Sequence, residues 1–348
     1  MTGLRYAGMG VLGIVVAVAG TQVVSVAQQD QKGAKPAAQT TATKKPAKKL
    51  HTAWGDPDLG GIWSNATTTP LERPSDLAGK AELSDSEHEE RQQKTQASRS
   101  TDNTPQAGDP GTYNEIWWER GKLLKTTSII IDPPDGRLPP LTPDGQKAAD
   151  KRAAERKGHE WDSVQDRNLH ERCLLYHGVP PMPTGYNNNY QIAQTPDYIA
   201  ILSEMIHEVR LIPLKPRPHT GPAMRQWMGD SRGHWEGETL VVETVNFNSY
   251  AGGLWALNHT NLEGSGETLK VIERFKRVDA DSMDYQFTID DPKTFTKPWT
   301  GSLPMSKIDG PIFEYACHEG NYAMSSILGG ARVEEKKATE EAAKKKQQ

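Results

Sequence analysis

The second half of the chain contains a segment, residues 283–290, that alternates strictly between apolar and polar side chains. Its apolar members are Met283, Tyr285, Phe287 and Ile289. A period of two residues is typical of an antiparallel strand with one face in a core and the other in water. The segment therefore predicts a half-buried strand and constrains the surrounding fold to a packed antiparallel sheet.

Other short runs rich in β-branched and aromatic residues surround this segment and are separated by turn signals. We expect strands at 126–132, 189–195, 198–203, 207–214, 239–247, 267–278, 295–302 and 313–317. Many consecutive short strands with few long helices favour a mainly β protein. We predict an antiparallel calycin-like or lipocalin-like barrel, or a sandwich, with an N-terminal helical and loop-rich elaboration.

Two further features agree with this class. Gly61-Ile62-Trp63 matches the Gly-x-Trp pattern that opens lipocalin barrels. Closure into a barrel would remove exposed strand edges and leave an interior able to hold one small ligand.

Two helices are predicted in the first half. Ser84 is an N-cap residue with Glu87 three positions later, so a capping box should open a helix over 84–98. A second helix should begin at Thr142-Pro143, with proline in its first turn, and run to Lys157.

The N-terminus has the pattern of a secretory signal peptide. Arg5 precedes a short apolar run, and the small residues of Ser25-Val26-Ala27 form a cleavage site. We therefore expect a periplasmic or secreted protein, with no transmembrane segment left after cleavage. An uncleaved membrane anchor is the alternative.

The remaining chain divides by composition. A Lys/Ala/Pro-rich tether that cannot bury a core should precede one β-rich domain and a charged C-terminal tail. The predicted boundaries are 1–27 for the signal peptide, 28–50 for the tether, 51–332 for the domain and 333–348 for the tail. Within the domain, 51–160 should be the loop- and helix-rich part and 161–332 the barrel.

Charge and cysteine content narrow the partners and the compartment. A formal net charge of −4 argues against a nucleic-acid binder, which would need a basic face. The only two cysteines, Cys173 and Cys317, lie 144 positions apart. In an oxidising compartment they most simply form one disulfide, with a chain-entropy stabilisation of about 4–5 kcal/mol. A metal-bound or nucleophilic cysteine is the alternative.

The chain resembles a widespread family of secreted bacterial proteins of unassigned activity. The resemblance covers nearly the whole mature chain but implies no particular function. The motifs that carry it are Asp56-Pro-Asp-Leu-Gly-Gly-Ile-Trp63, Gly229-Asp-Ser-Arg-Gly-His-Trp-Glu-Gly237, Glu273-Arg-Phe275, Asp291-Pro292 with Pro298-Trp-Thr300, and Tyr315-Ala-Cys-His-Glu-Gly-Asn-Tyr322.

The densest group of ionisable residues lies at 230–236. We predict a tight turn over the first residues and a short strand after it, so that His234 and Glu236 share a face. They could form an acid–base pair oriented by Asp230, with Arg232 stabilising an anion. The alternative is a charged turn that ties strands together through an Asp–Arg salt bridge.

Two other groups could contribute. His318 and Glu319 follow Cys317, so a disulfide would hold them rigidly as partners of the first group. Further upstream, Glu208 and Arg210 should share one face of a strand and His207 the other. Interior Glu–Arg pairs occur in ligand-binding barrels, but surface cross-strand pairs are the commoner alternative.

Ligand contacts are expected from aromatic residues, because tryptophan combines a large apolar surface with a polar N–H. The predicted ligand-binding residues are His207, Arg210, Trp227, Trp235, Trp255 and Trp299. No cofactor is predicted. A divalent metal is an alternative, because His207, His234 and His318 come from separate strand regions and could converge as ligands.

We therefore expect an exported barrel that binds a small organic molecule. The leading hypothesis is an enzyme of the non-redox acid–base type, a lyase, isomerase or hydrolase, using His234, Glu236, Asp230, Arg232, His318 and Glu319. The alternatives are a non-catalytic, lipocalin-like ligand carrier and a cell-envelope interaction protein.

Overall fold

A computed structural model describes residues 50–99, 115–248 and 266–346 of the chain. The predicted signal peptide, nearly all of the predicted tether and Trp255 lie outside these described residues. The described residues belong to one compact unit of the chain.

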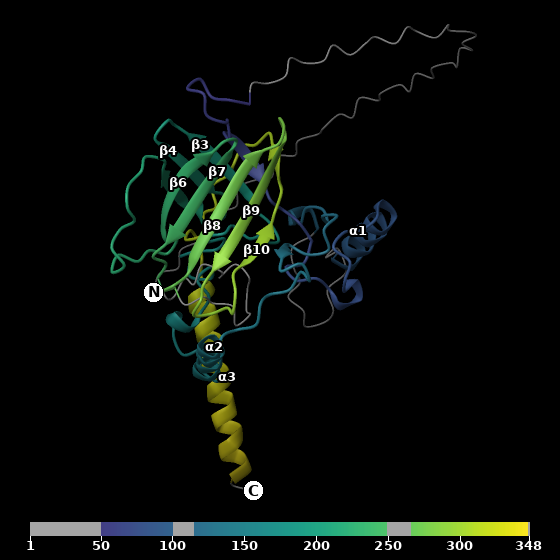
Figure 1. The fold of residues 1–348 in the computed structure, drawn as a ribbon. Coiled ribbons are helices and arrows are strands. Elements are labelled where there is room, and N and C mark those ends of the chain that lie inside the picture. The colour runs from purple at the N-terminus through teal and green to yellow at the C-terminus, as the bar shows by residue number, and fades with distance from the viewer. Residues whose placement is uncertain (1–49, 100–114, 249–265, 347–348) are drawn as a thin grey trace, which may run out of the picture. The chain divides into compact units, whose positions relative to one another are not determined.

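The centre of this unit is an antiparallel sheet of 11 strands. Their order is β5-β4-β3-β1-β11-β9-β8-β7-β6, and β10 pairs with β9 and β2 (Figure 1). The strands are β1 (Gly61–Ser64), β2 (Ile130–Asp132), β3 (Asn189–Gln194), β4 (Tyr198–Ser203), β5 (Val209–Pro213), β6 (Asp230–Glu236), β7 (Thr239–Val245), β8 (Lys270–Arg277), β9 (Ser282–Asp290), β10 (Trp299–Ser302) and β11 (Met305–Ile308). The prediction of a mainly β, antiparallel fold is confirmed.

The end strands of this order, β5 and β6, approach each other without a ladder. Among the described strands, no backbone pairing joins them, so hydrogen bonding does not close the sheet. Their side chains nevertheless meet, because Arg210 on β5 donates to Ser231 on β6 at 3.1 Å. Gly233 permits the close approach: a Cβ there would lie 2.9 Å from Ile212 Cγ2.

The core lies on the inward face of the sheet. The apolar members of β9 are fully buried, which confirms the alternation read from 283–290. Aromatic rings stack along this face, with Tyr285 4.7 Å from Phe275 and 6.0 Å from Phe287 between ring centroids. Trp299 on β10 is also fully buried and meets Phe287 edge-on.

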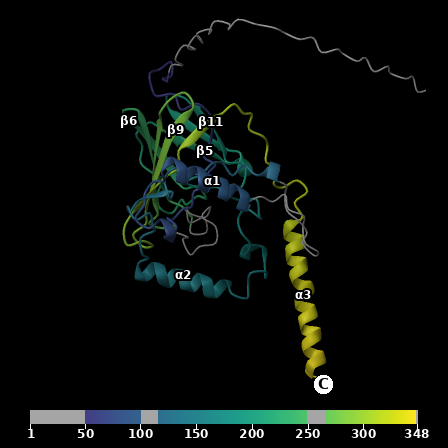
Figure 2. The same ribbon diagram turned by 90° about the vertical axis from the view of Figure 1, so that its right-hand side faces the viewer.

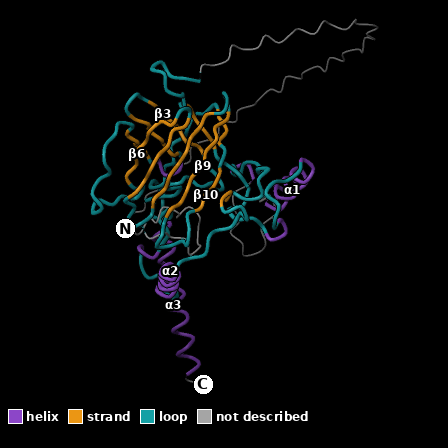
Figure 3. The backbone as a smooth tube through the Cα atoms, viewed as in Figure 1, coloured by secondary structure: helices purple, strands orange, loops and turns teal. Residues whose placement is uncertain are grey.

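Helices lie outside the sheet (Figures 2 and 3). They are α1 (Asp85–Arg99), α2 (Pro143–Arg156) and α3 (Ala323–Lys346), with short 3-10 helices at Ser75–Leu77, Glu115–Trp117, Val164–Asp166 and Met205–His207. Both predicted helix starts are confirmed, since the Glu87 carboxylate accepts from Ser84 N and Thr142 Oγ1 accepts from Gly145 N.

Three local predictions were wrong. Residues 230–236 form the single strand β6, without the expected turn, because every residue pairs with β7. Residues 313–317 are irregular, and the nearby strand is instead β11. His207 belongs to a 3-10 helix and precedes β5.

The predicted disulfide is present. The sulfur atoms of Cys173 and Cys317 are bonded, with their Cα atoms 5.8 Å apart. The bond joins the irregular segment after 3-10 helix Val164–Asp166 to the segment that leads into α3. Among the described helices, none has the length and apolar character needed to cross a membrane.

Candidate functional site

The polar residues of β6 are divided between two faces of the sheet. Ser231 and Gly233 are buried on the inward side, whereas His234 and Glu236 are exposed on the other. Alternation along a strand explains the division, because successive side chains point in opposite directions. The ionisable residues of the motif therefore alternate onto the outward side, and none of them lines the inward cavity described below.

Asp230 and Arg232 form a hydrogen-bonded cluster with His219 and Glu243. Asp230 pairs with Arg232, and its other oxygen accepts from the backbone N–H of Thr220 at 2.9 Å. His219 Nδ1 lies 2.9 Å from Asp230 Oδ2, and its Nε2 lies 3.3 Å from Glu243 Oε1. Burial opposes ionisation of Asp230, but these three donors together hold its pKa below the usual value.

His234 and Glu236 lie on the solvent-exposed face. His234 Nε2 is 3.3 Å from Glu236 Oε1, and Arg274 on β8 donates to the other carboxylate oxygen at 2.6 Å. Arg274, and secondarily His234, lower the pKa of Glu236. The predicted pair is thus close together, but its side chains are 59% and 49% exposed.

His318 and Glu319 lie in an exposed bend next to the disulfide. The strand expected for them is absent, and among the described residues no hydrogen bond or ion pair joins either residue to the β6 group. Asn321 in the same bend donates to Cys173 Sγ at 3.2 Å.

The predicted aromatic contacts also separate. Trp299 is a core residue, Trp235 is partly buried against the core, and Trp227 is 37% exposed. Arg210, in contrast, lines a cavity on the inward side of the sheet.

Arg210 belongs to a buried polar network that spans the inward face. Its guanidinium forms a two-pronged ion pair with Glu273 on β8, with one N–O distance of 3.0 Å. It also donates to Ser231 and to Thr244 on β7 at 3.1 Å each. Tyr285 Oη donates to Glu273 at 3.0 Å. Every member is buried and hydrogen-bonded, so the network joins five strands, β5 to β9.

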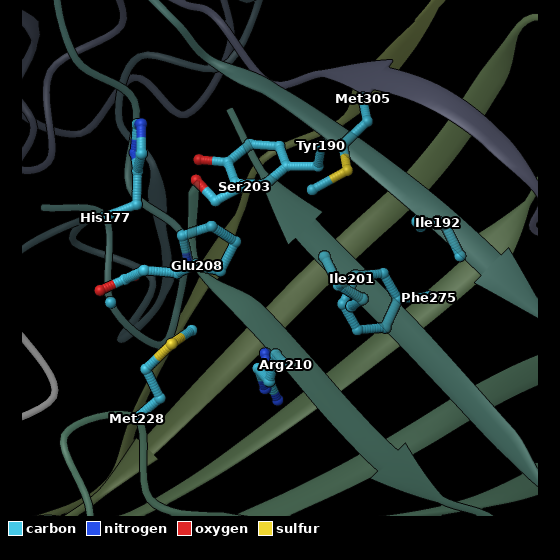
Figure 4. Close-up of a pocket in the computed structure, with 12 residues that line it drawn as sticks. His177, Tyr190, Ile192, Ile201, Ser203, Glu208, Arg210, Met228, Phe275 and Met305 are labelled. Carbon is cyan, nitrogen blue, oxygen red and sulfur yellow. The ribbon is translucent and has the colours of Figure 1, made fainter. Parts of the chain in front are cut away.

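A cavity adjoins this network (Figure 4). It offers about 20 Å³ to the centre of a water molecule, which is room for roughly one water-sized group. Its polar lining residues are His177, Tyr190, Ser203, Glu208 and Arg210. Figure 4 shows the hydroxyls of Tyr190 and Ser203 pointing toward the side where His177 and the Glu208 carboxyl lie.

Two buried oxygen atoms of this cavity have no hydrogen-bond partner among the described residues, Tyr190 Oη and Glu208 Oε2. Burial raises the pKa of Glu208 to about 8. It also raises the pKa of Tyr190 well above its usual value, an effect that nearby Asn65 opposes and Glu208 reinforces. Buried polar atoms are normally satisfied, so two such exceptions in one cavity make it the candidate functional site.

His177 has a different role. Its ring nitrogens lie 2.8 Å from Met182 O and 3.1 Å from Asn187 O. Burial lowers the pKa of His177 to about 4, although both carbonyls favour the charged form. The ring is therefore neutral at neutral pH, and its contacts lie within the segment 177–187, of which His177, Gly178 and Pro181 line the cavity.

Sequence reasoning missed Tyr190 and His177 as site residues, and it noted Glu208 only as a neighbour of Arg210. The available signal was the spacing of Glu208 and Arg210, which does place both toward the cavity. Tyr190 gave no separate signal, because it alternates with apolar residues along β3 as a core residue would.

No metal-binding group of three or more His, Cys, Asp or Glu side chains occurs within the described ranges. No protein-family model, curated protein or solved structure matches this chain.

Proposed function

We propose that this chain is an exported protein that binds a small organic molecule at the Glu208 cavity and transfers a proton through Glu208. The reaction would be of the non-redox acid–base type, a lyase, isomerase or hydrolase. The observation that carries the proposal is the presence of two buried, unpartnered oxygens, Tyr190 Oη and Glu208 Oε2, around one cavity.

Of the residues that line the cavity, Glu208 is the best suited to act as a general acid or base. General acids and bases work best when their pKa is near the operating pH, and the pKa of Glu208 is about 8. Its free oxygen has no internal partner to compete with a ligand. Tyr190 Oη can orient a bound group by hydrogen bonding.

The buried Arg210–Glu273 network supports this site from behind. Four hydrogen bonds hold the Arg210 guanidinium at the cavity wall. Groups positioned by packed strands and hydrogen-bonded neighbours are better preorganised than groups on loops. The network would therefore keep the cavity wall rigid.

The residues predicted as catalytic from the sequence are less well placed for catalysis than Glu208. Asp230, Arg232, His234, Glu236, His318 and Glu319 occupy separate places, and the first four already pair with protein partners. The calycin-like barrel also belongs to this proposal: side-chain contacts between β5 and β6 would substitute for the missing ladder. A non-catalytic carrier is less well supported, because a carrier does not require an acid–base group of raised pKa in its cavity, and Glu208 is such a group.

Export is supported by the disulfide, since such bonds persist in oxidising compartments. Expression of the full chain in a bacterium with a periplasm, followed by N-terminal sequencing of the mature protein, would test it. Cleavage after Ala27 is expected, and retention of the leader would contradict export.

Turnover of a panel of esters, lactones and enolisable carbonyl compounds, each with and without an amino group, tests the chemistry. Glu208→Gln should reduce turnover of any active substrate about 100-fold or more, the usual range for losing a general acid or base. The matched control is Glu238→Gln, which removes an exposed carboxylate from the β6–β7 turn. No turnover across the panel, or turnover unaffected by Glu208→Gln, would reject the proposal.

A further inference from the structure

We propose that the Glu208 cavity receives the positively charged head group of a small amine. This inference rests on the proposed function, because it assumes that the cavity is the ligand site, and it adds the chemical class of the ligand. It follows from the charges that line the cavity and from the atoms that could accept a hydrogen bond there.

Among the described lining residues of the cavity, one acidic group has no positively charged partner, and each positive charge is already paired. The titratable or charged lining residues are His177, Tyr190, Glu208 and Arg210. The charge of Arg210 is matched by Glu273, which lies behind it and is fully buried. His177 has both nitrogens directed at backbone carbonyls. Glu208 is thus the group whose charge a ligand can complement.

The hydrogen-bonding atoms of the cavity also suit a donor-rich ligand. An ammonium group has three N–H donors and no acceptor. Tyr190 Oη and Glu208 Oε2 have no internal partner, and Ser203 Oγ, which itself donates to Met205 O, retains lone pairs. These three oxygens would accept from one bound ammonium.

The walls favour a cation as well. The aromatic rings of Tyr190 and Phe275 line the cavity together with the thioethers of Met228 and Met305. Aromatic faces attract cations through their quadrupole, most strongly where water is excluded. The volume of about 20 Å³ admits one group of ammonium size, so only the head group would enter.

The other ligand charges fit less well. An anion would lie against the carboxyl of Glu208, and the nearest cation, Arg210, already donates four hydrogen bonds. A neutral carbonyl compound could accept from protonated Glu208, but it would leave the lone pairs of Tyr190 and Ser203 without a donor. A cation satisfies all three oxygens.

Cation binding should release a proton. Below the raised pKa of Glu208, about 8, the free cavity holds a neutral carboxyl group. Binding of a cation favours the carboxylate, so the carboxyl proton leaves to solvent while the cation takes its place. Near pH 6 about one proton should be released per cation bound, and release should disappear above the pKa.

The experiment compares three probes of similar size and different charge, methylammonium, formamide and formate, on the full chain. Binding is measured by NMR shifts of labelled residues around the cavity, and proton release by calorimetry in two buffers of different ionisation enthalpy. We expect methylammonium to bind and to release a proton, with formamide and formate at least 10-fold weaker.

Two variants test the role of the carboxyl group. Glu208→Gln should weaken methylammonium binding at least 10-fold and abolish proton release, whereas Glu238→Gln should change neither. Tyr190→Phe, which leaves Glu208 in place, should weaken binding but preserve proton release. This second variant tests the same geometry if Glu208→Gln does not fold, as checked by circular dichroism.

The outcomes separate the two proposals. Preferential binding of formamide or formate at the cavity would overturn the cationic class and leave the site itself supported. Methylammonium binding that is insensitive to both Glu208→Gln and Tyr190→Phe would also overturn this inference. If none of the three probes shifts the cavity residues, both the cation site and the proposed function are rejected.

Discussion

The inward and outward faces of β6 use polar residues in opposite ways. Inward Ser231 is 5% exposed and bonds to Arg210 and Thr244, in a network where each group has a defined partner. Outward His234 and Glu236 are about half exposed and can exchange their mutual contact for water. The same short motif therefore supplies a rigid interior scaffold and a solvated charged surface.

This difference has an energetic reason. An exposed ion pair contributes about 0–1 kcal/mol because water competes for both partners. A buried charge that loses its partner is strongly destabilising, because no solvent replaces the lost contact. Consequently, the buried polar residues of β6 and its neighbours should contribute more to stability than the exposed ones.

Removing the buried carboxylate should have the largest effect. Glu273→Ala leaves the Arg210 charge without its partner, and we expect a loss of about 3–5 kcal/mol in the free energy of unfolding. Urea denaturation measures it. Glu243→Ala, on the outward side of β7, is the control and should cost under about 1 kcal/mol. Equal costs for the two variants would remove the distinction between the faces.

The pH dependence of stability should reveal Glu208. Its pKa is raised from 4.5 to about 8, so the native state keeps a proton that the unfolded chain releases. The free energy of unfolding should therefore fall as pH rises from about 6.5 toward 8, by on the order of 2 kcal/mol. Below pH 6.5 the lowered pKa of His177 has the opposite effect, because the unfolded chain takes up a proton that the native ring does not. Denaturation at a series of pH values measures the slope.

Glu208→Gln should flatten this slope, because the amide does not titrate. Glu236→Gln should leave it intact, since Glu236 is exposed and its pKa is lowered. A slope that survives Glu208→Gln would mean that another group causes it.

The close approach of β5 and β6 should be sensitive to one methyl group. In Gly233→Ala the new Cβ would lie 2.9 Å from Ile212 and 3.0 Å from Leu214. Overpacking of this kind costs about 1–3 kcal/mol. Thermal unfolding compares it with Gly221→Ala, where nothing lies within 4 Å. A Gly233→Ala protein as stable as the control would show that β5 can move away from β6.

The smallest effect should come from the exposed pair. His234→Ala removes a half-exposed side chain and should cost under about 1 kcal/mol, with less effect at high salt. If the pair is structural, turnover of any substrate that the Glu208 test identifies should also be unchanged. A large loss of turnover would restore His234 as a catalytic residue and weaken the case for the cavity.

Several elements could be predicted from the sequence because their causes are local. The helix starts at Ser84 and Thr142 depend on a cap residue and its neighbours within one turn. The alternation of 283–290 directly indicates a strand with one buried face, and two lone cysteines leave one pairing.

The β6 motif could not be predicted in the same way. Glycine, aspartate and serine favour turns when judged locally, but pairing with β7 along the whole segment outweighs that preference. Which of its residues face inward depends on the register with β7. A shift of one residue would have placed Asp230 and Arg232 inside instead.

The sequence by itself determined the β class, the helix caps and the disulfide, since each depends on a period, a short-range contact or a unique pairing. Only the tertiary structure decided which polar groups share one environment. Glu208 directly precedes β5, Tyr190 lies on β3, and His177 lies in the loop before β3. They meet because the sheet brings these segments together. Burial there, which no local pattern encodes, is what changes their pKa values and makes the cavity the candidate site.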